Sequence, residues 1–189
     1  MTLKLLKESL LQAPIIRRGG YNYFIHPITD GIPQLKPDLL DEVCCALQKH
    51  MRLEDAEYIL TIESMGIHIA SALSLKTGLP LKIIRKKRYW LKDEKILKQK
   101  TGYGGGDLYM NYVSQGDKIA LVDAVISTGG TYKAVVEELS NVGAEVVDLG
   151  CAIGRGDGKE KIKSRFNLDV KTLADIEVID DVRIINSIE

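Results

Sequence analysis

The chain has 189 residues, and its 26 lysines and arginines equal its 26 aspartates and glutamates in number. This length predicts one domain, and 45% hydrophobic residues are enough to fill a core. The zero net charge and the 6% aromatic content argue against a protein that binds nucleic acid. No apolar run approaches the ~20 residues that cross a bilayer, so we expect no membrane-spanning segment.

The cysteines and histidines form no motif for a metal or a nucleophile. Cys44, Cys45 and Cys151 are odd in number and contain no CxxC pair, so we expect reduced thiols rather than a disulfide framework. No signal-peptide pattern opens the chain, and both observations favour a cytoplasmic protein. The three histidines fit no zinc-binding spacing, and we interpret His26 as a hydrogen-bonded structural residue.

The predicted elements alternate between strands and helices after an irregular start. An amphipathic helix at about 3–11 is followed by prolines and glycines up to residue 35, which predict turns and short extended pieces. Pro37 suits the first turn of a helix at 37–50. The pattern then predicts, in order, a strand at 56–62, a helix at 66–78, strands at 81–86 and 117–125, a helix at 131–143 and a strand at 144–153. We expect the tail at 169–185 to add short strands or a brief helix near the N-terminal lobe.

Two strand–helix–strand units predict an α/β fold with a mostly parallel sheet flanked by helices. Ligands bind such sheets where the strands end, which points to the loops at 63–66 and 126–131. The second loop has two glycines and three hydroxyls before a helix, a composition suited to a phosphate monoester. A plain strand–helix turn with Ser/Thr capping is the alternative.

Five segments of the chain resemble a known family. LVDAVISTGGT (121–131) resembles the motif that binds phosphoribosyl pyrophosphate in type I phosphoribosyltransferases. In the adenine phosphoribosyltransferase-like branch, IESMGIHIASAL resembles the pyrophosphate loop with its helix, IIRK the next strand, and residues 100–118 the hairpin before the central strand. Residues 13–33 resemble the hypoxanthine/guanine phosphoribosyltransferases of archaea. The resemblance covers nearly the whole chain.

This resemblance implies a fold and a reaction. The fold is one phosphoribosyltransferase domain over 1–189, in which residues 1–35 and the C-terminal tail form a small hood. The reaction is purine salvage: 5-phosphoribosyl passes from phosphoribosyl pyrophosphate to hypoxanthine or guanine, giving IMP or GMP and pyrophosphate. Mg²⁺ would come with the substrate rather than sit in a dedicated protein cage, and the protein would be a homodimer.

The resemblance also assigns residues to the parts of this reaction. Asp123 would be the catalytic residue, accepting hydrogen bonds from the ribose hydroxyls and stabilising a cationic ribosyl centre. The 5′-phosphate would be bound by Ser127, Thr128, Gly129, Gly130 and Thr131. Pyrophosphate would be bound by Ser64, Met65, Gly66, Arg85, Lys86 and Lys95. The base would contact Tyr23, Ile25, Ile153 and Arg155.

A strongly basic segment runs from residue 82 to residue 100. Its nine basic and two acidic residues give a local charge of +7, which predicts a partner with concentrated negative charge such as pyrophosphate. A solvated loop and a nucleic-acid patch are the alternatives. In the family this region is a mobile loop that closes over the substrate.

One position departs from the family motif. Ala124 stands where the family has a second acid, so one charged contact to the ribose or to Mg²⁺-bound water would be missing. An aspartate at position 124 is then expected to strengthen substrate binding. The same departure keeps an alternative function open: a catalytically weakened homologue of unknown base specificity, or a binding protein that senses phosphoribosyl pyrophosphate or a nucleotide.

Overall fold

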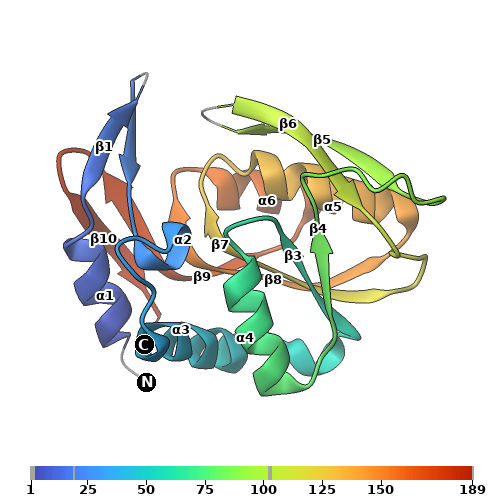
Figure 1. The fold of residues 1–189 in the computed structure, drawn as a ribbon, viewed down its shortest axis with the longest axis horizontal. Coiled ribbons are helices and arrows are strands. Elements are labelled where there is room, and N and C mark those ends of the chain that lie inside the picture. Colours follow the sequence, from blue (N-terminus) through green and yellow to red (C-terminus); the bar gives the residue numbers. More distant parts are fainter. Residues whose placement is uncertain (1–2, 19, 102–103, 189) are drawn as a thin grey trace.

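The computed structural model describes residues 3–18, 20–101 and 104–188, and a six-stranded sheet lies at its centre (Figure 1). The strand order is β10-β9-β8-β7-β3-β4, and every neighbouring pair is parallel except the antiparallel pair β9–β10. The strands are β3 (Tyr58–Ile62), β4 (Leu81–Ile84), β7 (Lys118–Ile126), β8 (Glu145–Arg155), β9 (Val170–Val178) and β10 (Val182–Ser187). The predicted α/β fold with a mostly parallel sheet is confirmed.

Helices cover both faces of this sheet, because side chains alternate between the faces along each strand. Ala120 and Val122 of β7 join the core under α1 (Lys4–Leu11), α3 (Pro37–His50) and α4 (Ile67–Thr77). Ile119 and Leu121 point to the other face, into the core under α5 (Gly130–Val142) and α6 (Gly158–Phe166). The central strand is therefore apolar on both sides, as its nearly continuous hydrophobic run predicts.

The first 35 residues form short elements against the tail. They contain the antiparallel hairpin β1 (Ile15–Arg18)–β2 (Tyr21–Phe24) and the one-turn helix α2 (Pro27–Asp30). The Arg17 guanidinium pairs with the Asp180 carboxylate at 2.6 Å, and the Asn22 amide donates to the Ile179 carbonyl at 2.6 Å. These contacts join the β1–β2 hairpin to the turn between β9 and β10.

His26 is the N-cap residue that precedes α2, and it is fully buried. Its Nδ1 accepts from the Ile28 N–H at 3.1 Å and its Nε2 lies 2.9 Å from Ser9 Oγ, so both ring nitrogens are hydrogen-bonded. Burial lowers the pKa of His26 to about 4, against a smaller opposing effect of Asp30. The neutral ring has the structural role that we predicted.

The tail lies beside the N-terminal lobe, as predicted, but it extends further than the short strands that we expected. β10 packs beside α1 and β9 contacts β2, while the nine-residue β9 also pairs with β8 inside the central sheet. Helix α6 was not predicted. A second antiparallel hairpin, β5 (Lys95–Thr101)–β6 (Gly104–Met110), packs against α5 (Figure 1). Tyr109 of β6 also forms two backbone hydrogen bonds with Arg85, the residue after β4.

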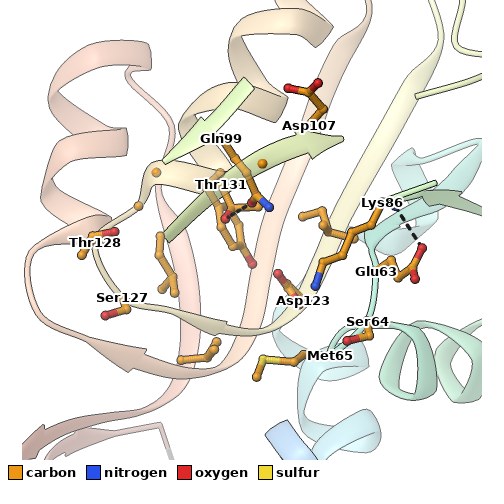
Figure 2. A pocket seen from close by; sticks show the side chains of 18 of the residues that line it. Glu63, Ser64, Met65, Lys86, Gln99, Asp107, Asp123, Ser127, Thr128 and Thr131 are labelled. Atoms are coloured by element: carbon orange, nitrogen blue, oxygen red, sulfur yellow. Dashed lines mark hydrogen bonds between the residues drawn. The ribbon is translucent and has the colours of Figure 1, made fainter. Parts of the chain in front are cut away.

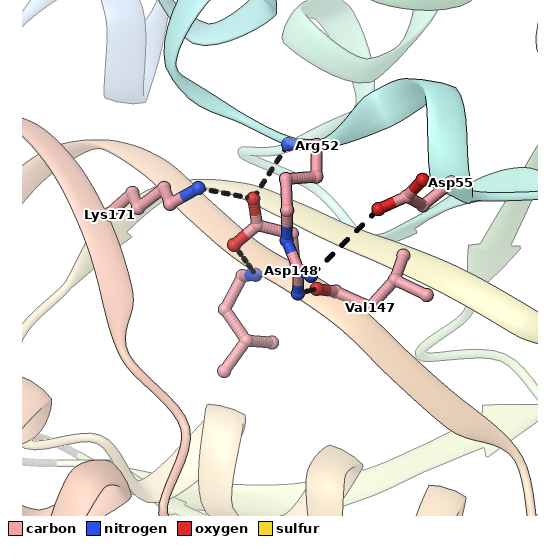
Figure 3. A network of polar contacts seen from close by, with 6 residues as sticks. Arg52, Asp55, Val147, Asp148 and Lys171 are labelled. Carbon is pink, nitrogen blue, oxygen red and sulfur yellow. Dashed lines mark hydrogen bonds and ion pairs between the residues drawn. The ribbon is translucent and has the colours of Figure 1, made fainter.

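A polar network ties three distant segments together at the end of the sheet where β8 begins (Figure 3). The buried Asp148 carboxylate accepts from the Arg52 N–H at 2.8 Å, from Lys171 Nζ at 2.6 Å and from the Leu149 N–H at 3.0 Å. The Arg52 guanidinium donates to the carbonyl of Val147, the extra residue where the β7–β8 register shifts. Arg52 belongs to the turn before the 3₁₀ helix η1 (Leu53–Asp55), so the network fixes this turn to β8 and β9.

Among the described residues, no helix is long and apolar enough to cross a membrane.

Candidate active site

A cleft of about 650 Å³ opens at the carboxyl ends of β3 and β7 (Figure 2). Its walls come from the loops that follow these two strands, from the β5–β6 hairpin and from Tyr23 of β2. Both loops that the strand-end rule singles out in the sequence therefore line the same cleft.

The loop from Ser127 to Thr131 forms one side of the cleft. Gly129 has a φ of +76°, and an added Cβ would lie 3.0 Å from the Cα of Gly158, so only glycine fits there. The Gly158 N–H donates to the Ser127 carbonyl at 2.9 Å, which holds the first residue of α6 against the loop. Because α5 begins directly at Gly130, its first backbone N–H groups have no partner within the helix and can donate to an anion.

Two side chains from other elements contact this loop. Thr131 Oγ1 donates to Gln99 Oε1 of β5 at 2.8 Å. Tyr21 Oη of β2 lies 3.2 Å from Ser127 Oγ. The hairpin and the N-terminal lobe therefore both reach the loop that carries the hydroxyl groups.

Asp123 lies at the floor of the cleft near the end of β7 and is 9% exposed. Its Oδ1 accepts from the Ala124 N–H at 2.7 Å. Burial raises the pKa of Asp123 to about 7, and the Ala124 N–H and the Lys86 charge oppose that rise. Figure 2 shows the Lys86 side chain extending toward Asp123.

The loop after β3 forms the opposite wall, through Glu63, Ser64 and Met65. The Glu63 carboxylate accepts from Arg85 Nε at 2.8 Å and from the Lys86 N–H at 3.0 Å. The hydrogen bond from Lys86, followed by the charge and hydrogen bond of Arg85, holds the pKa of Glu63 below its usual value despite partial desolvation. Glu63 thus fixes the end of β4, from which Lys86 enters the cleft.

Gly66 lets this loop approach the central strand closely. A Cβ on Gly66 would run into the Thr61 hydroxyl and would lie 2.9 Å from Asp123 Oδ1. Thr61 in turn donates to the Val122 carbonyl at 2.7 Å, which links β3 to β7 below the cleft. Gly66 therefore acts through the packing of Asp123 and does not itself line the cleft.

Residues 37–183 match the model of the phosphoribosyl transferase domain family. The chain belongs to this family. Two curated relatives are named hypoxanthine/guanine phosphoribosyltransferase. The protein of Methanocaldococcus infernus is 50% identical over 175 residues, covering 93% of this chain and 96% of the relative. The protein of Methanothermus fervidus is 45% identical over 186 residues, covering 98% of each.

The fold is shared with adenine phosphoribosyltransferases of known structure. The enzyme of Thermoanaerobacter pseudethanolicus superposes with a TM-score of 0.73 at 21% identity, covering 92% of this chain and 99% of that chain. The enzyme of Rhodothermus marinus gives 0.72 at 23% identity, with 92% and 97% covered. The resemblance to type I phosphoribosyltransferases is therefore confirmed.

The structure gathers most of the site residues expected of a phosphoribosyltransferase in one place. The cleft is lined by Tyr23, Ser64, Met65, Lys86 and Asp123, and by every residue from Ser127 to Thr131. Arg155 lies next to this cleft, in a small cavity under the β1–β2 hairpin.

Four of the expected residues lie elsewhere. Arg85 is held away by its ion pair with Glu63. Lys95 lines a different cavity, of about 850 Å³, between the segment after β6 and the C-terminal part of α5. Ile153 is fully buried because it points into the core, and the half-buried Ile25 lines neither the cleft nor the small cavity.

Ala124 is also placed differently from the expectation. Its methyl group is fully buried in the core with Ala120 and Val122, on the opposite side of β7 from Asp123, and it does not line the cleft. The strand alternation explains this, since neighbouring residues of a strand point to opposite faces. The prediction that an acid at position 124 would face the ribose is therefore wrong in this structure.

Several cations of the basic segment pair with acids of the same segment or of neighbouring elements. Glu94, whose side chain is 2% exposed, accepts from Arg88 Nε, from the N–H groups of Tyr89 and Trp90, and from the Asn111 amide. Lys82 pairs with Asp117 at 3.4 Å. The side chain of Lys100 and residues 102–103 lie outside the described residues. Closure of this region over a substrate stays a prediction.

Several residues of the site were not found from the sequence. Glu63 stood inside a loop already singled out, and its acidic side chain between Ile62 and Ser64 was the available signal. Gly158 closes the glycine-rich run GRGDG, which suggests a close backbone approach. Gln99 and Asp107 carry no such signal, because only the position of the β5–β6 hairpin brings them to the cleft.

Proposed function

We propose that this protein transfers the 5-phosphoribosyl group of phosphoribosyl pyrophosphate to hypoxanthine or guanine, forming IMP or GMP and pyrophosphate in purine salvage. The names of relatives at 45–50% identity over more than nine-tenths of this chain support the choice of base. The observation that carries the reaction is the cleft itself, where a phosphate-type loop, a buried carboxylate and a lysine meet around one cavity.

The residues divide the substrate between them. The backbone N–H groups and hydroxyls of Ser127 to Thr131 bind the 5′-phosphate. Lys86 and the loop at Ser64–Met65 bind the diphosphate. The bond between C1′ and the diphosphate oxygen breaks, and its electron pair leaves with pyrophosphate. N9 of the base forms a bond to C1′, and the proton on N9 is lost. Asp123, in its ionised form, accepts from the ribose hydroxyls and stabilises the positive charge that develops on the sugar.

Mg²⁺ fits this cleft as a companion of the substrate. Within residues 3–18, 20–101 and 104–188, no three His, Cys, Asp or Glu side chains gather closely enough to hold a metal ion by themselves. The cleft does offer the carboxylates of Asp107 and Asp123, and Mg²⁺ is commonly held by one or two carboxylates together with substrate phosphates. When bound, the ion supplies charge neutralisation on the leaving diphosphate.

The hood completes the site on the side of the base. We assign the base to Tyr23 and Arg155, beside Met65 and Val125. Residues 1–35 and the tail form this hood on a single domain, and the pairing of Arg17 with Asp180 supports that arrangement.

The protein is a cytoplasmic homodimer in this proposal. Tyr89, Trp90, Leu91 and Tyr112 are exposed large side chains near one another in the fold, and an apolar surface of this kind suits a protein contact. Free cysteines at positions 44, 45 and 151 suit a reducing compartment. Sedimentation velocity at micromolar concentration tests the dimer.

The competing sensor hypothesis rested on the missing acid at position 124. Since Ala124 lies in the core and not in the cleft, the described structure gives no observation that favours a sensor over an enzyme.

A panel of radiolabelled bases tests the proposed function. Adenine, hypoxanthine, guanine and xanthine are each incubated with phosphoribosyl pyrophosphate, Mg²⁺ and either the wild-type protein or Asp123→Asn. We expect IMP and GMP from the wild type and much less from the variant. Failure to form either nucleotide, or a faster reaction with adenine or xanthine, would overturn the proposal.

A further inference from the structure

A second, smaller cavity adjoins the cleft under the hood, and we call it the hood cavity. It shares Tyr23, Met65, Val125 and Ser127 with the cleft, so these four residues border both spaces. The hood cavity adds Tyr21, Phe24, Thr29, Asp30 and Arg155. Its aromatic and apolar lining, with few polar groups, is the composition of a site for a flat heterocycle.

Arg155 brings the positive charge into the hood cavity. It ends β8, and its guanidinium lies 4.3 Å from the centre of the Tyr21 ring. Tyr21 is itself positioned by Ser127, whose Oγ lies 3.2 Å from the tyrosine oxygen. A guanidinium has five N–H donors and no acceptor, so Arg155 can bond only to acceptor atoms of a ligand.

Asp30 provides a hydrogen-bond acceptor in the hood cavity. Its Oδ2 accepts from the His26 N–H at 3.1 Å and from Thr29 Oγ1 at 2.5 Å, which fixes the carboxylate at the end of α2. An ionised carboxylate only accepts hydrogen bonds. Among the described residues, no hydrogen bond to the other oxygen, Oδ1, is found, so this atom can accept from a ligand in the hood cavity.

The edges of the purines differ in the way that these two residues differ. Hypoxanthine and guanine present the acceptors O6 and N7 and the donor N1–H. Adenine presents a donor, N6–H₂, in place of O6, and an acceptor in place of N1–H. Arg155, which only donates, and Asp30, which only accepts, therefore match the O6 acceptor and the N1–H donor of hypoxanthine and guanine. On adenine they would face a donor at N6 and an acceptor at N1.

We propose that Arg155 and Asp30 select 6-oxopurines against adenine in the hood cavity, with Arg155 donating to O6 and Asp30 accepting from N1–H. This inference rests on the proposed function and names the residues that choose its base. Neither the relatives' names nor the shared fold says which residues make that choice, and solved proteins of this fold include adenine phosphoribosyltransferases.

The size of the hood cavity shows what must move. Its volume of about 30 Å³ holds roughly one or two water molecules, which is far less than a purine needs. Arg155 packed over the Tyr21 ring closes the space, so the base enters as the guanidinium leaves that ring. The cation–π contact is then exchanged for hydrogen bonds that a 6-oxopurine offers and adenine does not.

The test compares kcat/KM for hypoxanthine, guanine and adenine among the wild type, Arg155→Gln and Asp30→Asn. Glutamine has both an acceptor and a donor for the N6 and N7 atoms of adenine. We expect Arg155→Gln to lower kcat/KM for hypoxanthine about tenfold or more while adenine is used as well as before or better. In Asp30→Asn the amide keeps one oxygen for the His26 N–H and places an NH₂ group where the other oxygen was. We therefore expect Asp30→Asn to lower kcat/KM for hypoxanthine and guanine and to leave kcat/KM for adenine unchanged.

Two controls separate specificity from damage to the fold. Arg165→Gln removes an exposed arginine paired with Glu137, far from the hood cavity, and should leave all three values unchanged. The KM for phosphoribosyl pyrophosphate should also stay unchanged in Arg155→Gln. An equal loss for all three bases, or an unchanged ratio of hypoxanthine to adenine, would overturn the inference.

Nucleotide binding keeps the inference testable without turnover. Calorimetry should show IMP binding the wild type at least about tenfold more tightly than AMP, and Arg155→Gln should remove that difference. Equal binding of IMP and AMP by the wild type would refute the selection by Arg155 and Asp30. A wild type that prefers IMP but forms no nucleotide would refute the proposed function and leave this selection standing.

Discussion

A carboxylate can stabilise a developing cation only when it is ionised, and this condition applies directly to Asp123. Burial raises its pKa to about 7, so near neutral pH a substantial fraction of the free protein carries a protonated Asp123. Lys86 is the nearest source of opposing charge, because it extends into the same cleft. The ionisation of Asp123 therefore depends on a balance between desolvation, which disfavours the carboxylate, and the Ala124 N–H and Lys86, which favour it.

This balance predicts the pH dependence of the reaction. The raised pKa means that ionisation, and with it kcat/KM for phosphoribosyl pyrophosphate, should increase as pH rises through about 7. Asp123→Asn should lower kcat/KM about tenfold or more and remove this limb of the profile. Lys86→Met should move the limb to higher pH, because its charge holds the pKa down. A profile that is flat from pH 5.5 to 8.5 in the wild type would contradict the assignment.

The second residue-scale prediction concerns Ala124. Because its side chain is in the core, Ala124→Asp places a carboxylate among apolar groups and should lower the free energy of unfolding by about 3 kcal/mol or more at pH 8. The pKa of a buried acid rises, so the loss should be smaller at pH 5 than at pH 8.

Ala124→Val is the volume-matched control for this change. It overfills the same space without charge, at a cost of about 1–3 kcal/mol that does not depend on pH. Urea denaturation at both pH values separates the two effects. An Ala124→Asp protein that is stable at pH 8 and binds Mg²⁺–phosphoribosyl pyrophosphate more tightly would show that the side chain faces the ribose after all.

At the scale of elements, the phosphate-type loop depends on a helix that makes no other contribution to the cleft. Helix α6 begins at Gly158, and a Cβ there would run into the Ser127 carbonyl and lie 2.7 Å from the Gly129 nitrogen. Because residue 158 has no side chain, α6 packs directly against the loop and holds its backbone N–H groups and hydroxyls in position. The Lys159–Asp175 ion pair at 2.6 Å fixes the same end of α6 to β9.

Gly158→Ala should therefore displace the loop. We expect the KM for phosphoribosyl pyrophosphate to rise about tenfold to a hundredfold, since small displacements at a binding site have effects of this size. Lys161→Ala in the same helix changes an exposed residue and should leave the KM as it was. Steady-state kinetics of the two variants decides the question, and a normal KM in Gly158→Ala would mean that the loop does not rely on α6.

The helices and strands that the sequence predicts well are those whose apolar residues repeat with the period of a helix or a strand. The helix at 37–50 and the strand at 117–125 bury regular sets of side chains, and both are found within one residue of the expected bounds. Helix α6 buries little beyond Gly158 and Ile162, so its charged sequence GKEKIKSRF contains no apolar stripe to detect. In β9, Lys171 and Asp175 break the apolar run, and only their pairing with Asp148 and Lys159 explains how they enter the sheet.

The site shows the same division. A glycine and hydroxyl loop is a local signal, and Ser127 to Thr131 indeed line the cleft. Charge counting over 82–100 indicated cations but not their directions: Lys86 lines the cleft, whereas Arg85 pairs with Glu63 and Lys95 lines another cavity. Directions of side chains on a hairpin follow from where the hairpin packs, and that depends on α5.

For the whole molecule, stability and chemistry are placed at opposite ends of the sheet. The cleft lies at the carboxyl ends of the parallel strands, whereas the Asp148 network lies where β8 begins (Figure 3). There, one buried carboxylate joins Arg52, Leu149 and Lys171, so segments more than a hundred residues apart in sequence meet at a single side chain. Substitution at this position should affect the fold and spare the reaction.

Asp148→Asn tests this separation. The amide keeps one acceptor but turns an NH₂ group toward donors and removes the charge that pairs with Lys171, whose side chain is 36% exposed. We expect the free energy of unfolding to fall by about 1–3 kcal/mol, with kcat/KM unchanged for both substrates at a temperature where the variant is folded.

Asp169→Asn, which removes the exposed partner of Lys163, should cost about 0.5 kcal/mol or less. Urea denaturation with parallel kinetics measures both quantities. Equal stabilities of the two variants would show that the network does not hold the three segments together, and a loss of activity in folded Asp148→Asn would show that the two ends of the sheet are coupled.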